Sequence, residues 1–252
     1  MAFTSLDGYI EDEGGGFDWA MPDPEVHAYV NDLARPAGTY LYGRRMYETM
    51  AVWQTVGVEP SASPEEADVP AVELDFADVW RAADKIVYSR TLHAVSTPRT
   101  RLEGEFDPDA VRHLKDTTDL DLAVSGPGLA QHAFAARLVD ELHLFVFPVV
   151  VGGGKAGLPH GMHIDLDLLD ERRFRDGTAY MRYERRCGPS REGLLGPAGR
   201  PRRRSGDGEP VHDSPSRAIV ERHGREPVVV QLVDLDHSAR STEMIGLVER
   251  QR

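Results

Sequence analysis

The sequence predicts an α/β domain over residues 1–187, with a mostly parallel central sheet and an antiparallel edge at its C-terminal end. First, strand-like and helix-like segments alternate along most of this region, which is typical of a parallel sheet. Second, residues 141–151 are apolar at both odd and even positions, as in a central strand that is covered on both faces. Third, two late strands near 163–169 and 178–185 have little helix between them, which indicates an antiparallel pair.

The chain opens in a short strand and a glycine-rich loop, and its first helix is expected to start at Pro22–Pro24. Proline is favourable in a first helical turn because the N–H that it lacks has no partner there. Apolar residues then follow at the i, i+3, i+4, i+7 spacing of one helix face. They are Val26, Tyr29, Val30 and Leu33.

Short strands and helices alternate through the middle of the chain. Residues rich in β-formers predict a strand at 39–42, and a helix follows over 44–53. Residues 54–72 hold several Pro, Ser and Glu residues and are interpreted as a surface loop. A helix around 74–83 then leads to a strand at 85–88.

The same alternation continues in the second half of the domain. Residues 98–103 fit another strand, and Asp107-Pro108 caps a helix that extends to about Thr117. A strand at 120–124 ends in a glycine-bearing turn, and the helix after it buries apolar residues between 129 and 138.

The charge distribution suggests a boundary near residue 187. Residues 1–187 hold 18 Lys/Arg against 32 Asp/Glu, whereas residues 188–252 hold 11 against 10. Residues 188–216 are rich in Gly, Pro and Arg and are predicted to be a disordered linker. Residues 217–252 are predicted to form a small separate module with a strand at 227–233.

Composition excludes several classes of protein. The acidic balance of residues 1–187 argues against nucleic-acid binding there. Cys187 is the only cysteine, so no internal disulfide and no cysteine-based zinc site can form. No apolar run approaches the ~20 residues of a membrane helix, and no signal peptide is recognised at the N-terminus. These features predict a cytoplasmic location.

The first of three polar turns follows the predicted strand at 39–42. Gly43 allows the backbone to approach a ligand closely, and the next helix offers free N–H groups to an anion. Arg44 and Arg45 add positive charge. Taken alone, the same residues also fit an ordinary turn followed by two solvated arginines.

The second and third turns follow the strands at 85–88 and 120–124. Ser89 and Arg90 suit the 2′-phosphate of NADPH, because arginine makes bidentate contacts to phosphate. Gly126 and Gly128 lie at a strand-to-helix junction that can direct N–H groups at a phosphate. An ordinary polar loop and a purely geometric glycine turn are the alternatives. Together, the three turns supply anion sites in an acidic chain, as a dianionic cofactor requires.

The ordered set of motifs resembles the dihydrofolate reductase superfamily, most of all the RibD C-terminal branch, the reductase half of the riboflavin-biosynthesis deaminase-reductase. The resemblance covers nearly all of residues 3–186. The motifs are Ser5-Leu6-Asp7-Gly8-Tyr9-Ile10, Leu41-Tyr42-Gly43-Arg44-Arg45-Met46-Tyr47-Glu48, Ile86-Val87-Tyr88-Ser89-Arg90, Ser125-Gly126-Pro127-Gly128, and Val139-Asp140-Glu141-Leu142 running to Pro148 and Gly152-Gly153-Gly154-Lys155.

This resemblance implies a dihydrofolate-reductase-like three-layer fold, with NADPH lying across the sheet. It implies that Gly43, Arg44 and Arg45 face the cofactor phosphates and that Ser89 and Arg90 hold the 2′-phosphate. It further implies a homodimer and a small heterocyclic or carbonyl substrate, as in 5-amino-6-(5-phosphoribosylamino)uracil reductase. The residues implied to cradle the pyrophosphate are Gly126, Gly128 and Leu129.

By the same resemblance, the loop from Asp7 to Trp19 borders the nicotinamide and the substrate. Hydride transfer needs a proton donor or a polarising group near the acceptor. Asp7 is the first candidate and Glu25 the second, while Trp19 and Asp23 are assigned to substrate contact. An aspartate before Gly8 also fits a purely turn-forming role.

The sequence departs from the family pattern in places. Dihydrofolate reductases anchor the pterin with a carboxylate near the start of the first helix, and the aligned position here is Pro24, between Asp23 and Glu25. So few residues precede Ser5 that we expect the first strand to continue upstream of Met1. No deaminase zinc signature is present, so only the reductase half is represented.

Other motifs are set aside. Gly152-Gly153-Gly154-Lys155 does not match a nucleotide-binding P-loop, since Val149 stands in for its first glycine and Ala156 for its Ser/Thr. His160 and His163 have no evident third partner and are interpreted as surface histidines, so no metal site is predicted.

Two alternatives to the reductase stay open on the same fold. One is a nucleotide-binding or partner-binding protein without catalysis, and the other is a dihydrofolate reductase. In the tail, Ile219–Val230 resembles the central hairpin of the Phd/YefM antitoxin family, with residues 243–247 in the helix that follows it.

Overall fold

The fold is described from a computed structural model, which places residues 1–58, 69–186 and 228–231. It alternates strands and helices as the sequence predicts. The strands are β1 (Ala2–Thr4), β2 (Tyr9–Glu11), β3 (Ala37–Gly43), β4 (Asp84–Tyr88), β5 (Thr100–Glu103), β6 (Asp121–Ser125), β7 (Glu141–Val146), β8 (Lys155–Ala156), β9 (Leu166–Arg173), β10 (Ala179–Arg185) and β11 (Val228–Gln231). The helices are α1 (Pro24–Ala34), α2 (Arg44–Met50), α3 (Ala71–Ala82), α4 (Pro108–Thr117) and α5 (Pro127–Ala135), with 3₁₀ turns η1 (Asp18–Ala20) and η2 (Ala51–Gln54).

The main sheet has the strand order β5-β4-β3-β6-β11-β7-β10-β9, and β1 pairs with a further part of β7. From β5 to β7 all neighbouring strands are parallel. β10 pairs antiparallel with both β7 and β9. The predicted mostly parallel sheet with an antiparallel C-terminal edge is therefore confirmed. A second, two-stranded sheet joins β2 and β8.

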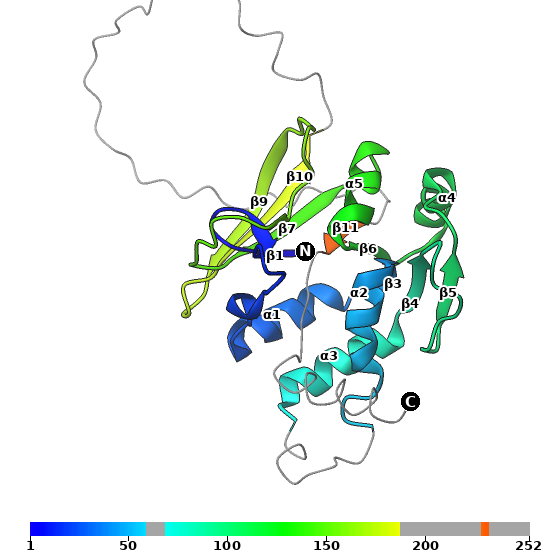
Figure 1. The fold of residues 1–252 in the computed structure, drawn as a ribbon, viewed down its shortest axis with the longest axis horizontal. Coiled ribbons are helices and arrows are strands. Elements are labelled where there is room, and N and C mark those ends of the chain that lie inside the picture. The colour runs from blue at the N-terminus through cyan, green and yellow to red at the C-terminus, as the bar shows by residue number, and fades with distance from the viewer. Residues whose placement is uncertain (59–68, 187–227, 232–252) are drawn as a thin grey trace, which may run out of the picture.

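Helices cover both faces of the sheet and make the three layers visible in Figure 1. The residues of strand β3 alternate between the two faces of the sheet. Tyr40 and Tyr42 pack with the core beneath α1, α2 and α3, while Leu41 packs with the core beneath α4 and α5. This period-two alternation with apolar residues on both sides is what a central, doubly covered strand requires.

Helix α1 begins as the sequence predicts. The side chain of Asp23 accepts a hydrogen bond from the backbone N–H of Val26 at 2.8 Å, which satisfies one of the unpaired groups of the first turn. Val26 and Val30 of the predicted stripe are fully buried. Asn31 anchors the helix to α3 by donating to the carboxylate of Asp75 at 2.7 Å.

The boundaries differ from the prediction in several places. The helix predicted over 44–53 is two pieces, α2 and η2, and the strand predicted over 141–151 ends at Val146. Part of the predicted surface loop, residues 59–68, lies outside the described residues, as does the predicted linker 188–216. None of the helices in the described ranges is long and apolar enough to cross a membrane.

The tail strand lies in an unpredicted place. A strand was expected at 227–233, and β11 indeed spans Val228–Gln231. It does not stand apart from the domain, however, because it lies between β6 and β7 and pairs with both in parallel. The rest of the predicted tail module falls outside the described residues.

A buried polar network fastens β10 to β7. Arg182 donates to both carboxylate oxygens of Glu141, at 2.7 and 2.8 Å. His143 lies 3.3 Å from the same carboxylate through Nε2 and 3.1 Å from the hydroxyl of Tyr180 through Nδ1. Burial lowers the pKa of His143 to about 4, so this imidazole is neutral at physiological pH.

Candidate active site

The three polar turns lie side by side at the carboxyl edge of the parallel strands. In the sheet, Gly43 is the register partner of Tyr88, and Tyr42 is the partner of Ser125. Ser89 and Gly126, which follow Tyr88 and Ser125, therefore leave the sheet next to Gly43. In open α/β sheets, ligands bind at this edge, so the predicted convergence of the three turns is present in the fold.

Side-chain contacts join the first turn to the second. Arg44 donates to the hydroxyl of Thr91 at 3.0 Å and forms an ion pair with Glu48 at 2.7 Å. The hydroxyl of Ser89 accepts from the backbone N–H of Leu92 at 3.0 Å, which holds the second turn closed. Arg44 thus bridges the two turns, with much of its charge already matched by Glu48.

Two other arginines at this edge are available to a ligand. The side chains of Arg45 and Arg90 are exposed, and neither forms an ion pair with any residue that the structure describes. Because arginine makes paired hydrogen bonds to phosphate, these two guanidinium groups are the natural contacts for an anion at this edge.

The third turn has the backbone geometry of an anion cradle. Gly126 has φ of +96°, a conformation that favours glycine. A Cβ atom placed on Gly128 would meet no atom within 4 Å, so the space above this turn is open. The first hydrogen bond of α5 runs from Ala130 N–H to the carbonyl of Gly126, so the N–H groups of Gly128 and Leu129 have no acceptor within the helix. These groups fit a dinucleotide phosphate.

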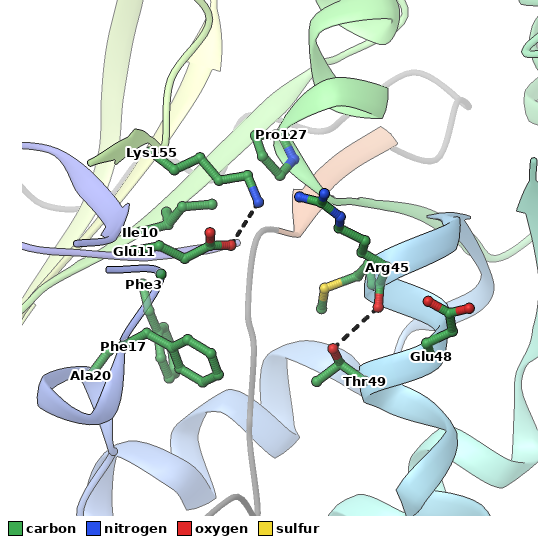
Figure 2. Close-up of a pocket in the computed structure, with 12 residues that line it drawn as sticks. Phe3, Ile10, Glu11, Phe17, Ala20, Arg45, Glu48, Thr49, Pro127 and Lys155 are labelled. Atoms are coloured by element: carbon green, nitrogen blue, oxygen red, sulfur yellow. Dashed lines mark hydrogen bonds and ion pairs between the residues drawn. The ribbon is translucent and has the colours of Figure 1, made fainter. Parts of the chain in front are cut away.

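A cavity of about 350 Å³ adjoins the first and the third turn, through Arg45 and Pro127. Figure 2 shows that one side comes from β1, β2, β8 and the loop before α1, and the other from α2 and the start of α5. It has apolar walls with charged groups at opposite sides. Its lining residues are Phe3, Ile10, Glu11, Gly15, Phe17, Ala20, Arg45, Met46, Glu48, Thr49, Pro127 and Lys155.

Comparison with known proteins fits this geometry. The family model for the RibD C-terminal domain matches residues 1–180. The chain belongs to the RibD C-terminal domain family. It is 26% identical over 182 residues to the uncharacterized protein YyaP of Bacillus subtilis (strain 168), an alignment that covers 71% of this chain and 90% of YyaP.

The first of two similar solved structures shares the fold of this RibD C-terminal domain. A "Putative riboflavin biosynthesis protein" from Shewanella sp. PV-4 matches with a TM-score of 0.56 and 20% identity, covering 74% of this chain and 97% of the other. A pyrimidine reductase-like protein from Corynebacterium diphtheriae matches with a TM-score of 0.47 and 13% identity, covering 74% and 90% of the two chains. The family match stops before the tail, so its resemblance to Phd/YefM antitoxins stays a prediction.

Of the residues predicted to bind NADPH, Arg45 lines the cavity. Pro127, between the predicted Gly126 and Gly128, lines it too. The sheet edge that carries the three polar turns and the cavity are thus continuous in this RibD C-terminal domain.

Asp7, the first predicted proton donor, has a structural role in the described part of the chain. Its carboxylate accepts hydrogen bonds from the backbone N–H groups of Gly152 at 2.8 Å and Val151 at 3.2 Å. A hydrogen bond from Ser5 and these backbone bonds lower its pKa, which favours the charged form. Asp7 is not among the lining residues of the cavity, and its catalytic role stays a prediction.

The other predicted substrate-side residues also lie outside the lining. Glu25 forms an ion pair with Arg172 of β9 at 3.0 Å, and Asp23 caps α1. Trp19 packs edge-on against Phe147, with ring centroids 6.4 Å apart, and its buried indole N–H has no acceptor within the described part of the chain. Its near neighbours, Phe17 and Ala20, do line the cavity.

The charged pair in the cavity, Lys155 and Glu11, was not predicted. Lys155 donates to Glu11 at 2.6 Å, and Figure 2 shows this pair facing Arg45 across the cavity. Gly154 makes the pairing of β8 with β2 possible: its φ is +128°, and a Cβ atom there would come within 2.0 Å of the carbonyl oxygen of Glu11. The Gly-Gly-Gly-Lys motif does not match a P-loop, but it places a lysine in the cavity.

Proposed function

We propose that this chain is an NADPH-dependent reductase that transfers a hydride to a small heterocyclic or carbonyl substrate held in the cavity. The observation that carries the proposal is that the cavity adjoins two of three neighbouring polar turns, through Arg45 and Pro127. Membership of the RibD C-terminal domain family supports the same reaction class.

In this proposal the protein holds the cofactor by its phosphates. The free N–H groups of Gly128 and Leu129 would face the pyrophosphate. Arg45 would add charge to that site, and Arg90, beside Ser89, would take the 2′-phosphate. When bound, NADPH supplies the hydride, and the task of the protein is to orient it and to keep water away.

The cavity sets the class of acceptor. Phe3, Phe17 and Met46 offer apolar surfaces for a flat ring, and the Lys155–Glu11 pair offers a donor and an acceptor for its polar atoms. Lys155 is also placed to supply the proton that completes a reduction. The name of the family makes the uracil precursor of riboflavin the first compound to test.

A homodimer is part of the proposal. The edge strand β9 exposes Leu168 and Leu169, which are 51% and 39% accessible, and apolar side chains on an edge strand favour contact with another copy. Sedimentation of the full chain checks this, since a monomer at all concentrations would exclude it.

The cofactor is tested by thermal shift of the full chain. A ligand at 100 times its Kd stabilises by about 2.7 kcal/mol, and at about 2–4 °C per kcal/mol we expect NADPH to raise Tm by roughly 5–10 °C. NADH and AMP should do much less. Equal increases in Tm with all three compounds would contradict a binding site for the 2′-phosphate at Ser89 and Arg90.

Arg90→Ala should narrow the preference for NADPH over NADH, because only NADPH carries the group that Arg90 contacts. Arg173→Ala is the matched control, since Arg173 is also exposed but lies on the distant edge strand β9.

The reaction is tested by following NADPH oxidation over a panel of pyrimidines, pterins and quinonoid compounds. Tight NADPH binding without turnover on any of them would favour a binding protein on this fold.

A further inference from the structure

A second cavity, of about 470 Å³, lies at the opposite end of helix α5 from the candidate active site. The first residue of α5, Pro127, lines the active-site cavity, and Phe134 in its last turn lines the second cavity. Val139, which precedes β7, also lines the second cavity. This cavity therefore lies toward the amino ends of the parallel strands, away from the polar turns at their carboxyl ends.

The apolar residues of this cavity are more buried than its charged ones. Phe134 and Val139 are buried, and Met162 and Ile164 are partly buried against the same hydrophobic core. An apolar base with charged groups around it is typical of a site for a small organic molecule.

Three arginines line the cavity, against one acidic residue, Asp165. This reverses the acidic balance of the chain as a whole. The arginines are Arg137, Arg185 and Arg186. Arg186 donates to Asp167 at 2.9 Å, whereas Arg137 and Arg185 form no ion pair within the described ranges. Two guanidinium groups are thus available for an anion.

Arg137 occupies a backbone position that favours glycine. Its φ is +55°, directly after the end of α5. Its N–H donates to the carbonyl of Phe134, and the N–H of Leu138 donates to the carbonyl of Ala133, both at 3.0 Å. These two bonds define a Schellman motif, in which the left-handed residue is usually glycine or asparagine. The chain keeps an arginine there at a cost in free energy, which indicates a role for its side chain.

We propose that this arginine-lined cavity binds a small phosphate monoester that carries a flat apolar group. Arg137 and Arg185 pair with the phosphate, because guanidinium groups make paired hydrogen bonds to phosphate oxygens. Phe134 and Met162 contact the apolar group. Because the cavity lies at the other end of α5 from the active-site cavity, this inference does not depend on the reductase proposal.

Calorimetric titration of the full chain with phenyl phosphate tests the proposal. We expect phenyl phosphate to bind. Phenol lacks the anion and inorganic phosphate lacks the ring, so each should bind about tenfold more weakly or give no signal.

Arg137→Gly separates a ligand-binding role of Arg137 from a structural one. Glycine suits the left-handed backbone, so this variant should unfold at the same temperature as the parent or higher. Its Kd for phenyl phosphate should nevertheless rise about tenfold, and so should that of Arg185→Met. Arg99→Gly is the matched control, because Arg99 also has a left-handed φ of +54° but pairs with Asp84 at 3.0 Å and does not line this cavity. Its Kd should equal that of the parent.

Three results would overturn the inference. The first is no binding of phenyl phosphate at millimolar concentration. The second is binding that Arg90→Ala weakens and Arg137→Gly does not, which would assign the phosphate to the polar turns. The third is an unchanged Kd with a lower Tm in Arg137→Gly, which would assign Arg137 to the end of α5, where a cation interacts with the helix dipole. If Arg137→Gly does not fold, the Kd of Arg185→Met decides.

Discussion

Replacing Lys85 with methionine should stabilise this protein. Lys85 is 1% exposed, and its ammonium group has no hydrogen-bond acceptor among the residues that the structure describes. It lies 4.0 Å above the ring of Trp80, and its cross-strand partner Tyr40 also has a buried hydroxyl with no hydrogen-bond partner in the described ranges. A buried charge with no counter-ion is costly.

The magnitude follows from the pKa of Lys85. Burial, with a smaller contribution from Arg99, lowers it from 10.5 to about 8. One pKa unit corresponds to about 1.4 kcal/mol, so the charged form costs about 3 kcal/mol in the folded state. The contact with Trp80 offsets about 1–2 kcal/mol of this. Lys85→Met should therefore raise the free energy of unfolding at pH 7 by about 1–2 kcal/mol.

The low pKa of Lys85 also determines how the stability of the protein changes with pH. Below pH 8, Lys85 is charged in both states and the full penalty applies. Between about pH 8 and 10.5 the unfolded chain binds more protons than the folded one, so the stability of the parent rises with pH. The advantage of Lys85→Met should shrink over that range.

Urea unfolding of parent and variant at pH 7 to 9.5 measures both effects. The difference between the two proteins is the useful quantity, because burial also raises the pKa of Tyr40 and Tyr180 and thereby lowers the stability of both proteins at higher pH. Lys155→Met, at a side chain that is 35% exposed, is the control and should give no gain. A Lys85→Met protein that is less stable than its parent at pH 7 would refute the reasoning.

Two further outcomes are expected. Burial lowers the pKa of His143 from 6.5 to about 4, so the parent should lose up to about 3 kcal/mol of stability as pH falls from 6.5 to 4. His143→Gln should reduce this loss of stability at acid pH, as measured by urea unfolding. An unchanged loss in the variant would contradict a buried, neutral His143. If Lys155 donates the proton, Lys155→Met should lower kcat/KM for the acceptor by roughly 10²–10⁴-fold, while the Kd for NADPH, read by fluorescence, stays constant. Lys155→Arg keeps the positive charge but does not release a proton, so it should lose activity to a similar extent. A matching loss of NADPH affinity would instead place Lys155 at the cofactor.

The sheet and its turns were predictable because their signals are local. Tyr40, Leu41 and Tyr42 alternate between the two cores, as a doubly covered strand must. The glycines and arginines that follow β3, β4 and β6 indicate an anion edge because parallel strands bring their carboxyl ends together. The turn-forming alternative for Asp7 was local too, and the hydrogen bond from Gly8 N–H to the carbonyl of Ser5 agrees with it. The bonds that the carboxylate of Asp7 accepts from Val151 and Gly152 are long-range and were not predicted.

The charged pair in the cavity and the place of the tail strand were not predictable in this way. Glu11 and Lys155 are 144 residues apart, on strands of three and two residues that carry no periodic pattern. β11 pairs with strands more than 80 residues earlier, across a segment whose composition indicates a separate unit. Lys85 is a charged residue within an otherwise ordinary strand, and nothing beside it in the sequence indicates that it is buried.

The contact of Gly154 with the backbone of Glu11 separates what can vary at this site from what cannot. A methyl group at position 154 would collide with main chain, so relatives that keep this wall must keep the glycine. The next side chain projects into the cavity and meets no such constraint. A lineage could therefore exchange Lys155 for a neutral, acidic or bulky residue and move to another acceptor while its backbone stays in place.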